Sequence, residues 1–351
     1  MLTCVLTAHG SDSPDWEVVP KKKVRKLSQA ELDSKLMLAL QQGNTKLAKQ
    51  YARKGANVNW VNTANGLTPL QYFAPKGASK AVKFLLANKA DVNVRLADGA
   101  NTLILMARIN TSAADIVQML IDAKIDVNAI DSYGMNALAY YVQSGNEQMV
   151  RALLKAPNIV LTGSNSIDAP SAAEETDKTK AFKNSPIWFA AANGYTTIVS
   201  ALLTKEPTLA YERGGVDGST PLIIAAKNCH ADTVETLLKT VEQYETKFSA
   251  VTRYIDHQND EHVTATMFSA ARCCVNDSQT LYVLLGSNPD LTLIGPGKEV
   301  DDPHYGTKRV NPQTIYDYAS YATSKTTEFG HCPGNTQLLC TRYKVKPACA
   351  N

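Results

Sequence analysis

The sequence predicts an all-α solenoid, in which short helix–turn–helix repeats stack side by side. The first observation is a leucine or isoleucine that returns at a nearly fixed period, and four of the six copies have a glycine seven residues later. The copies are Leu36, Leu70, Leu103, Leu138, Ile187 and Leu222, so the successive steps are 34, 33, 35, 49 and 35 residues. Self-similarity at such a period is typical of repeat architectures, whose units bury their apolar faces against their neighbours.

The second observation is a repeated apolar pattern that follows each landmark. It places apolar residues at i, i+3 and i+4, a spacing that gathers them on one face of a helix. The pattern begins at Val82, Val117, Val150, Val199 and Val234. Each repeat is therefore expected to contain a second helix that packs against its neighbours.

Residues 65–93 show how one repeat is built. Thr68 and Pro69 predict a helix start, because Thr can cap exposed amides and Pro lacks an N–H that the first turn would leave unpaired. A short helix over 70–74 should end near Pro75, and Gly77 should separate it from a second helix around 81–86. The exit ends in Asp-Val-Asn, residues 91–93, and related exits stand at 55–59 and 125–128. Asp and Asn there are expected to bond neighbouring backbone and hold the turn.

The segment from Gly66 to Leu70 carries a family resemblance. It resembles the G-x-T-P-L-x-x-A pattern of ankyrin repeats, with Gln71 at the position where the family usually has His, and the period agrees. The resemblance implies an ankyrin-repeat solenoid of about seven repeats with a C-terminal cap. It also implies a non-catalytic module that binds another protein along its concave face and needs no cofactor.

Three segments are predicted along the chain. Residues 1–27 should form a flexible arm, residues 28–293 the solenoid, and residues 294–351 an irregular capping segment and tail. A small, polar and charged stretch at 162–184 should form a loop insertion within the solenoid. The junction at 240–263 is long, Met267 begins a degenerate seventh repeat, and 295–312 is interpreted as a loop.

Composition limits the function classes. A net charge of +3 is too small to argue for binding to nucleic acid or to an acidic membrane surface. The chain has no apolar run long enough to cross a membrane, and its start lacks the pattern of a signal peptide. Seven irregularly spaced cysteines favour a reducing compartment, so a cytoplasmic location is expected. The protein is also expected to be a monomer. The basic run from Lys21 to Lys26 resembles a nuclear localisation signal, although a solvated charge run is the favoured interpretation.

The resemblance also marks a surface for partner binding, because family members bind through the turn tips and the exposed side of the first helices. Most of the residues at these positions would be ordinary turn residues even in a true interface, since few interface residues carry much binding energy. The candidate residues are Trp60, Asn65, Leu67, Lys76, Arg95, Asp98, Arg108, Tyr133, Met135, Gln143, Asp217, Ser219, Lys227 and Asn228.

An enzyme is the competing class. His257 and His262 precede Cys273 and Cys274, and a Cys–His pair could act as a nucleophile, with the repeats as a targeting arm. No local signature of a cysteine hydrolase accompanies them, so packed thiols are favoured and no catalytic residue is assigned.

The tail contains four ligands of suitable type for zinc, namely His331, Cys332, Cys340 and Cys349. Their spacing fits no common zinc pattern, so no metal is assigned. The glycines at 214–218 lack the Lys and the preceding strand of a phosphate-binding loop.

Two further expectations come from the resemblance. Asn93 and Asn128 fit a pattern that is hydroxylated in some family members, although a turn-holding role is favoured. The irregular repeats also resemble the divergent ankyrin proteins that intracellular bacteria or viruses deliver into host cells. A secreted effector that acts on host proteins in the host cytosol is therefore one hypothesis.

Overall fold

Pairs of helices make up most of the described structure. The computed structural model describes residues 26–161, 185–215, 217–244, 254–271, 279–291, 293, 295–301 and 308–313. The first helices of the pairs are α1 (Gln29–Gln41), α3 (Pro69–Phe73), α5 (Thr102–Arg108), α7 (Ala137–Gln143), α9 (Pro186–Ala192), α11 (Pro221–Lys227) and α14 (Ala265–Ala271). The second helices are α2 (Thr45–Arg53), α4 (Ser79–Ala87), α6 (Ala114–Asp122), α8 (Glu147–Leu153), α10 (Thr196–Lys205), α12 (Ala231–Tyr244) and α15 (Gln279–Gly286). A short 3₁₀ helix, η1 (Pro207–Tyr211), follows α10.

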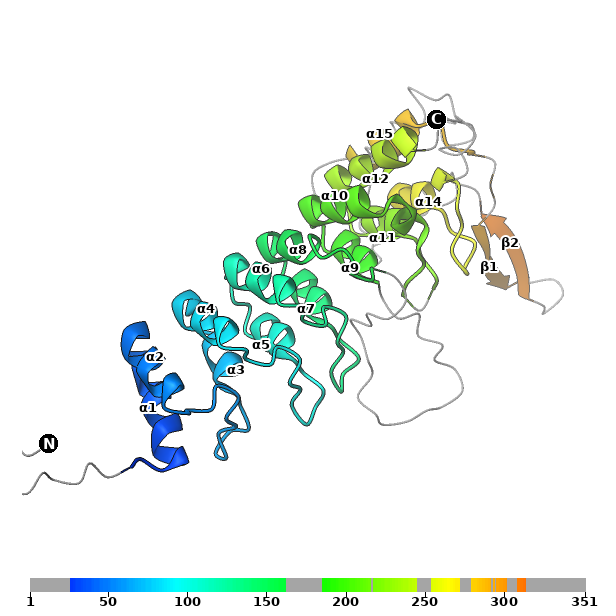
Figure 1. The fold of residues 1–351 in the computed structure, drawn as a ribbon. Coiled ribbons are helices and arrows are strands. Elements are labelled where there is room, and N and C mark those ends of the chain that lie inside the picture. The colour runs from blue at the N-terminus through cyan, green and yellow to red at the C-terminus, as the bar shows by residue number, and fades with distance from the viewer. Residues whose placement is uncertain are drawn as a thin grey trace, which may run out of the picture.

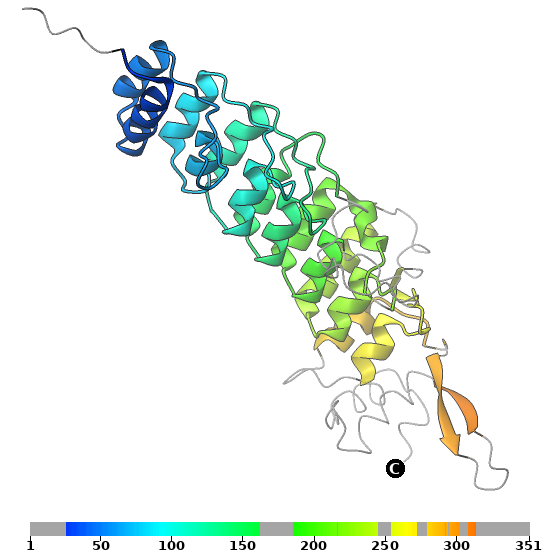
Figure 2. The same ribbon diagram turned by 90° about the horizontal axis from the view of Figure 1, so that it is seen from below.

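The pairs stack in one direction to give an elongated solenoid. The second helices form one layer and the first helices form another, with the inter-repeat turns projecting beyond the first helices (Figure 1). Figure 2 shows the same extended stack from below. The predicted all-α solenoid is confirmed. Within the described residues, no helix is long and apolar enough to cross a membrane.

Local sequence explains where the first helices begin. The hydroxyl of Thr68 accepts a hydrogen bond from the backbone N–H of Gln71, and the Gln71 side chain bonds back to the N–H of Thr68. Pro69 occupies the first turn, as the sequence predicts. Ser185, before Pro186, caps α9 by accepting a hydrogen bond from the backbone N–H of Trp188. These caps satisfy amides that the start of a helix would otherwise leave unpaired.

The periodic residues form the core. The six landmark residues Leu36, Leu70, Leu103, Leu138, Ile187 and Leu222 are at most 1% exposed, and the five valines that begin the second-helix pattern are fully buried. They belong to one continuous hydrophobic cluster that extends from the first helix pair to the last. Neighbouring repeats therefore supply the core for one another.

Asparagines tie successive exits together. The side chain of Asn93 donates to the carbonyl of Lys124 at 3.3 Å and accepts from the backbone N–H of Asp126 at 2.8 Å. Asn59 makes the same pair of bonds to Lys89 and Asp91. Asn128 bonds Asn158 and Val160. We call these three residues the asparagine ladder. They hold turns as predicted, and they also clamp each repeat to the next.

The structure corrects the interpretation of residues 295–312 as a loop. Strand β1 (Gly295–Asp301) pairs antiparallel with β2 (Lys308–Gln313), and the register shifts between Gly295 and Lys298. The predicted insertion at 162–184, the arm up to residue 25 and the tail from residue 314 lie outside the described residues. Cys229 lies in the turn after α11 with φ 65° and is disulfide-bonded.

Candidate partner-binding surface

The inter-repeat turns and the exposed sides of the first helices form one surface, which we call the turn-side face. It is the face that the resemblance marks for binding. The turns close by short backbone bonds, such as Asp131 N–H to the Met135 carbonyl at 3.1 Å and Leu96 N–H to the Ala100 carbonyl at 2.9 Å. Gly99 and Gly134 adopt positive φ angles of 82° and 72° in these turns, a conformation that favours glycine. The side chains next to them are therefore held on short, well-defined loops.

Arg108 joins two successive turns on this face. From the end of α5 its guanidinium bonds Asp98 at 2.6 Å and Asp131 at 2.7 Å. The side chain of Asp131 is fully buried, and it also accepts a bond from the Tyr140 hydroxyl at 2.7 Å. Tyr133 packs with its ring centre 5.8 Å from the guanidinium carbon. We call Asp98, Arg108, Asp131 and Tyr140 the arginine network.

The network shifts the pKa of Asp98, Arg108 and Tyr140. Hydrogen bonding to Arg108 is the main cause that lowers the pKa of Asp98. Burial opposes the charge of Arg108, but bonds to Asp131, Asp98 and Tyr140 outweigh that effect and raise the pKa of Arg108. Burial, together with the bond to Asp131, raises the pKa of Tyr140. These shifts favour the charged forms of Asp98 and Arg108 and the neutral form of Tyr140.

An equivalent arrangement recurs near the other end of the solenoid. Lys227 stands ten residues after Asp217, as Arg108 stands ten after Asp98, and its ammonium lies 3.4 Å from the Asp217 carboxylate. Asn259 of the following turn donates to Asp217 at 3.3 Å. The two turns also share a backbone bond of 2.8 Å, matching the 2.7 Å bond between the turns of the arginine network. We call Asp217, Lys227 and Asn259 the lysine network.

The other candidate residues play mixed roles. Arg95 forms an exposed ion pair with Asp126 at 2.6 Å. Lys76 lies over the ring of Tyr72 at 3.8 Å. Asn228 donates to the carbonyl of Ala192 at 2.7 Å and so ties two repeats together.

Accessibility separates the remaining candidates. Met135 and Ser219 are buried, as is Asp217 of the lysine network, so they shape turns rather than an accessible surface. Asn65 and Gln143 are exposed, whereas Trp60 and Leu67 are partly buried. Among all the candidates, Tyr133 is the large apolar side chain that is most exposed, at 60%.

Several residues of this surface were missed from the sequence. Asp131, Tyr140 and Asn259 complete the two networks, and aligning the turns with one another would have revealed the recurring polar position that Asp131 and Asn259 share. Ile109 is 63% exposed at the end of α5, and Ile130 is 44% exposed in the turn before Tyr133. No periodic pattern distinguishes such exposed residues, because periodicity reports the buried face.

The structure describes only some of the candidate catalytic and metal-binding residues. Cys273 and Cys274, and the tail set of His and Cys, lie outside the described residues. His257 is partly buried, and burial, together with the charge of Arg213, lowers its pKa. His262 is exposed in the next turn with φ 58°. Within the described part of the chain, no three His, Cys, Asp or Glu residues are grouped as a metal site.

Known proteins with ankyrin repeats match this chain. Neurogenic locus notch homolog protein 1 of Xenopus tropicalis is 33% identical over 125 residues, which cover 35% of this chain and 5% of that protein. Neurogenic locus notch homolog protein 2 of Homo sapiens is 31% identical over 121 residues, covering 34% and 5%. The match thus spans about 5% of the length of these curated relatives. The crystal structure of the human ASB11 ankyrin repeat domain aligns with 72% of this chain and 96% of its own, at 20% identity and a TM-score of 0.46.

A family model described as ankyrin repeats (3 copies) matches residues 36–129, 76–165 and 165–247. These matches run without a gap from 36 to 247, which is more than half of the 351 residues. They stop before α14 and α15, so the count of about seven repeats stays a prediction. The chain belongs to the ankyrin-repeat family.

Proposed function

We propose that this protein is a non-catalytic module that binds one partner protein through the turn-side face around Tyr133. Ankyrin-repeat domains are generally non-enzymatic modules for protein–protein interaction, and solenoids offer extended binding surfaces. The observation that carries the proposal is the pairing of an exposed aromatic ring with a rigid support. Tyr133 is 60% exposed, and its backbone N–H is bonded at 2.9 Å to Asp131 of the arginine network.

The support matters because binding is weakened when loose groups must be ordered on association. The Asp131 carboxylate accepts the N–H groups of Tyr133 and Met135, so the turn tip is fixed before any partner arrives. Tyr side chains are enriched at interface hot spots, and the exposed Ile130 nearby in the turn adds apolar area. The proposed contact is therefore an aromatic anchor on a preorganised turn.

The test is affinity capture from a eukaryotic lysate followed by mass spectrometry. The wild type is compared with Tyr133→Ala, and Tyr282→Ala serves as the matched control, because Tyr282 is 44% exposed on α15. A partner that is recovered by the wild type and the control but lost with Tyr133→Ala supports the proposal. Equal recovery by all three would place the binding site on another surface.

Secretion into a host cell and action as an effector are the finer part of the proposal. They are supported only by the irregular repeats and the insertion at 162–184. A monomer in the cytoplasm fits a binding module of this kind, whereas the disulfide at Cys229 runs against a reducing compartment. A fluorescent reporter fused to the chain tests where the protein is located. The redox state of Cys229 in the producing cell tests whether that compartment is reducing.

The alternative is an enzyme whose site lies in the C-terminal third. It would be favoured if a cellular effect of this protein were lost with Cys273→Ala and Cys274→Ala but kept with Tyr133→Ala. The opposite pattern supports the binding module.

A further inference from the structure

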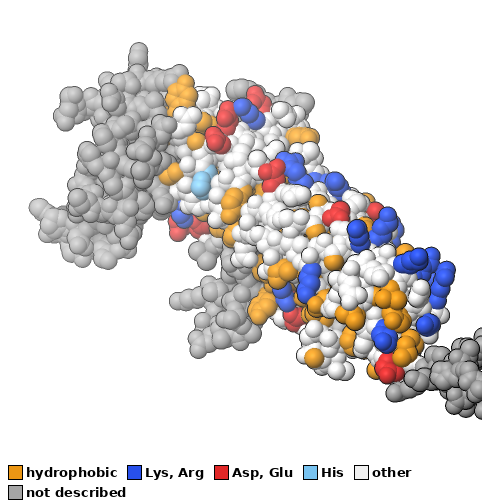
Figure 3. Space-filling model, turned by 90° about the vertical axis from the view of Figure 1, so that its left-hand side faces the viewer, with side chains coloured by type: hydrophobic (Ala, Val, Ile, Leu, Met, Phe, Trp, Pro, Cys, Tyr) orange, Lys and Arg blue, Asp and Glu red, His pale blue; other side chains and the backbone are white. Residues whose placement is uncertain are grey.

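Positive charge is concentrated in the first two repeats. Residues 26–90 hold ten Lys and Arg against two Asp and Glu, a net charge of +8, while the whole chain has only +3. Figure 3 looks onto this end of the solenoid and shows Lys and Arg side chains gathered along one edge. The small net charge of the chain therefore hides a strongly basic region.

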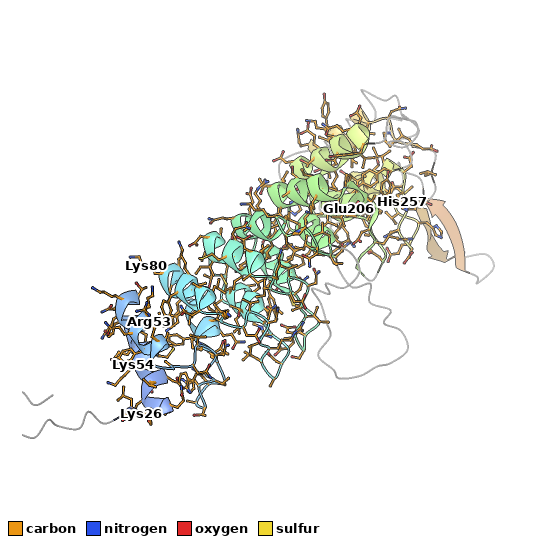
Figure 4. All side chains as sticks on the ribbon, viewed as in Figure 1. Lys26, Arg53, Lys54, Lys80, Glu206 and His257 are labelled. Carbon is orange, nitrogen blue, oxygen red and sulfur yellow. The ribbon has the colours of Figure 1, made fainter. Side chains whose placement is uncertain are left out.

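The exposed cations form a ladder on two neighbouring second helices. Lys46, Lys49 and Arg53 stand at i, i+3 and i+7 on α2, and Lys80 and Lys83 stand at i and i+3 on α4. Lys46 and Lys80, like Lys49 and Lys83, are one repeat apart, and α2 packs against α4. Figure 4 labels Arg53 and Lys80 on this pair of helices. We call these five residues the basic ladder, and all of them are exposed.

The ladder ends abruptly at the third repeat. The positions on α6 that correspond to Lys80 and Lys83 are Asp115 and Gln118, 35 residues later. Asp122, one turn further along α6, adds a second carboxylate. Basic outer helices are thus a property of the first two repeats and not of the solenoid as a whole.

The ladder cations stand apart from the ion pairs that form in the described part of the chain. Within the described residues, no Asp or Glu lies within ion-pair distance of any of the five, although exposed pairs form elsewhere, such as Arg151 with Glu147 on α8. Like charges three and four residues apart weaken a helix. Such repulsion is relieved when a partner of opposite charge covers the surface.

The dimensions favour an acidic protein segment. Lys46 and Arg53 are separated by about 10 Å along α2 at 1.5 Å per residue, and packed helices lie about 8–10 Å apart. Carboxylates on one face of a two-turn helix, or on alternate residues of a short strand, cover such an area. A nucleic acid would need a longer track of cations. A membrane surface would need exposed apolar anchors, and α2 and α4 expose no large hydrophobic side chain.

We propose that the basic ladder is a second docking surface, which receives a cluster of Asp and Glu side chains on a partner protein. It lies on the second helices and is separate from Tyr133. Its cations are mainly lysines, which act as mobile point charges rather than planar forks, so they suit a carboxylate cluster of variable geometry.

The test measures binding of a fluorescent oligoglutamate peptide to the full chain by anisotropy at low ionic strength, with oligoglutamine as the neutral probe. The ladder variant is Lys49→Glu with Lys83→Glu. The matched control is Lys124→Glu with Lys155→Glu, which changes the net charge equally at exposed sites outside the ladder. We expect the ladder variant to weaken binding at least about tenfold, and the control by no more than about twofold.

Binding should also weaken at about 0.15 M salt, where the Debye length falls to about 8 Å. Tyr133→Ala should bind the peptide as the wild type does, so failure of this inference is distinguishable from failure of the proposed function. If charge reversal disturbs folding, as judged by circular dichroism, Lys46→Gln with Lys80→Gln is a milder second variant.

Equal weakening by the ladder and control variants, or no binding at low salt, would overturn the inference. Tighter binding to phosphatidylserine vesicles or to short duplex DNA would overturn it as well.

Discussion

Replacing Arg108 with Met tests whether the arginine network holds two repeats together. Met retains an apolar stem but removes every donor, so the fully buried carboxylate of Asp131 loses its cation. Removing one partner of a buried ion pair typically costs about 3–5 kcal/mol. Two features should reduce this loss. Arg108 is 23% exposed, so solvent already weakens its ion pairs, and its Nε atom is buried without a partner, a cost that the Met variant removes. Asp131 also keeps the Tyr140 hydroxyl. We therefore expect a loss of about 2–3 kcal/mol.

Lys227→Met is the matched comparison, because it removes the cation at the equivalent position. The Lys227–Asp217 distance is longer, at 3.4 Å, and the Lys227 side chain is 37% exposed. The third member of that network, Asn259, is neutral. We expect a loss of about 1 kcal/mol or less, as is usual for pairs that reach solvent.

The assay is equilibrium unfolding in urea, followed by circular dichroism, from which the free energy of unfolding of each variant is obtained. The urea concentration at the unfolding midpoint should be well below that of Lys227→Met for the Arg108→Met variant. Equal losses for the two variants, or a loss under about 1 kcal/mol for Arg108→Met, would refute the argument that burial of Asp131 makes its cation indispensable.

Three further predictions concern other parts of the solenoid. Asn93→Ala should lower the free energy of unfolding by about 1–2 kcal/mol, because it breaks two bonds between repeats, and thermal unfolding would show it. Gly194→Ala should destabilise more than Gly77→Ala in the same measurement. Both have φ of 68°, but a Cβ at Gly194 would lie 2.5 Å from the His230 ring, while Gly77 faces open space. The pKa of His257 is lower in the folded protein than its ordinary value of 6.5, so the unfolded chain takes up a proton more readily. The contribution of His257 to stability is therefore complete above pH 6.5 and is lost as the pH falls through the folded pKa. His257→Gln should flatten that loss in unfolding curves recorded at a series of pH values.

Periodicity carried most of the fold prediction. Leu70 and Val82 mark two helices of one repeat, and both are buried where the pattern required. Helix starts were predictable too, because the Thr68–Pro69 signal acts within a few residues. The strand pair at 295–313 was missed because Gly-Pro-Gly at its start is typical of a loop, and pairing depends on a partner segment across a turn.

The binding surface was less predictable than the fold. Tyr133, Asp98 and Arg108 were named from the resemblance, and the structure brings them together. Asp131 was not named, although it lies only two residues before Tyr133, because its contact with Arg108 spans 23 residues and crosses from one repeat to the next. A pattern read one repeat at a time cannot show which polar residues meet between repeats.

The asparagine ladder has a consequence for the length of the molecule. Each of its residues bonds the same two backbone positions of the repeat that follows, so Asn59 could take the place of Asn93. Excising residues 60–93, one whole unit between two rungs, should give a shorter protein whose remaining junctions are unchanged in kind. Asp256 makes only the accepting half of this contact, to the N–H of Asp290 at 2.8 Å. Whole units are therefore expected to be interchangeable in the N-terminal part of the chain and not at its C-terminal end.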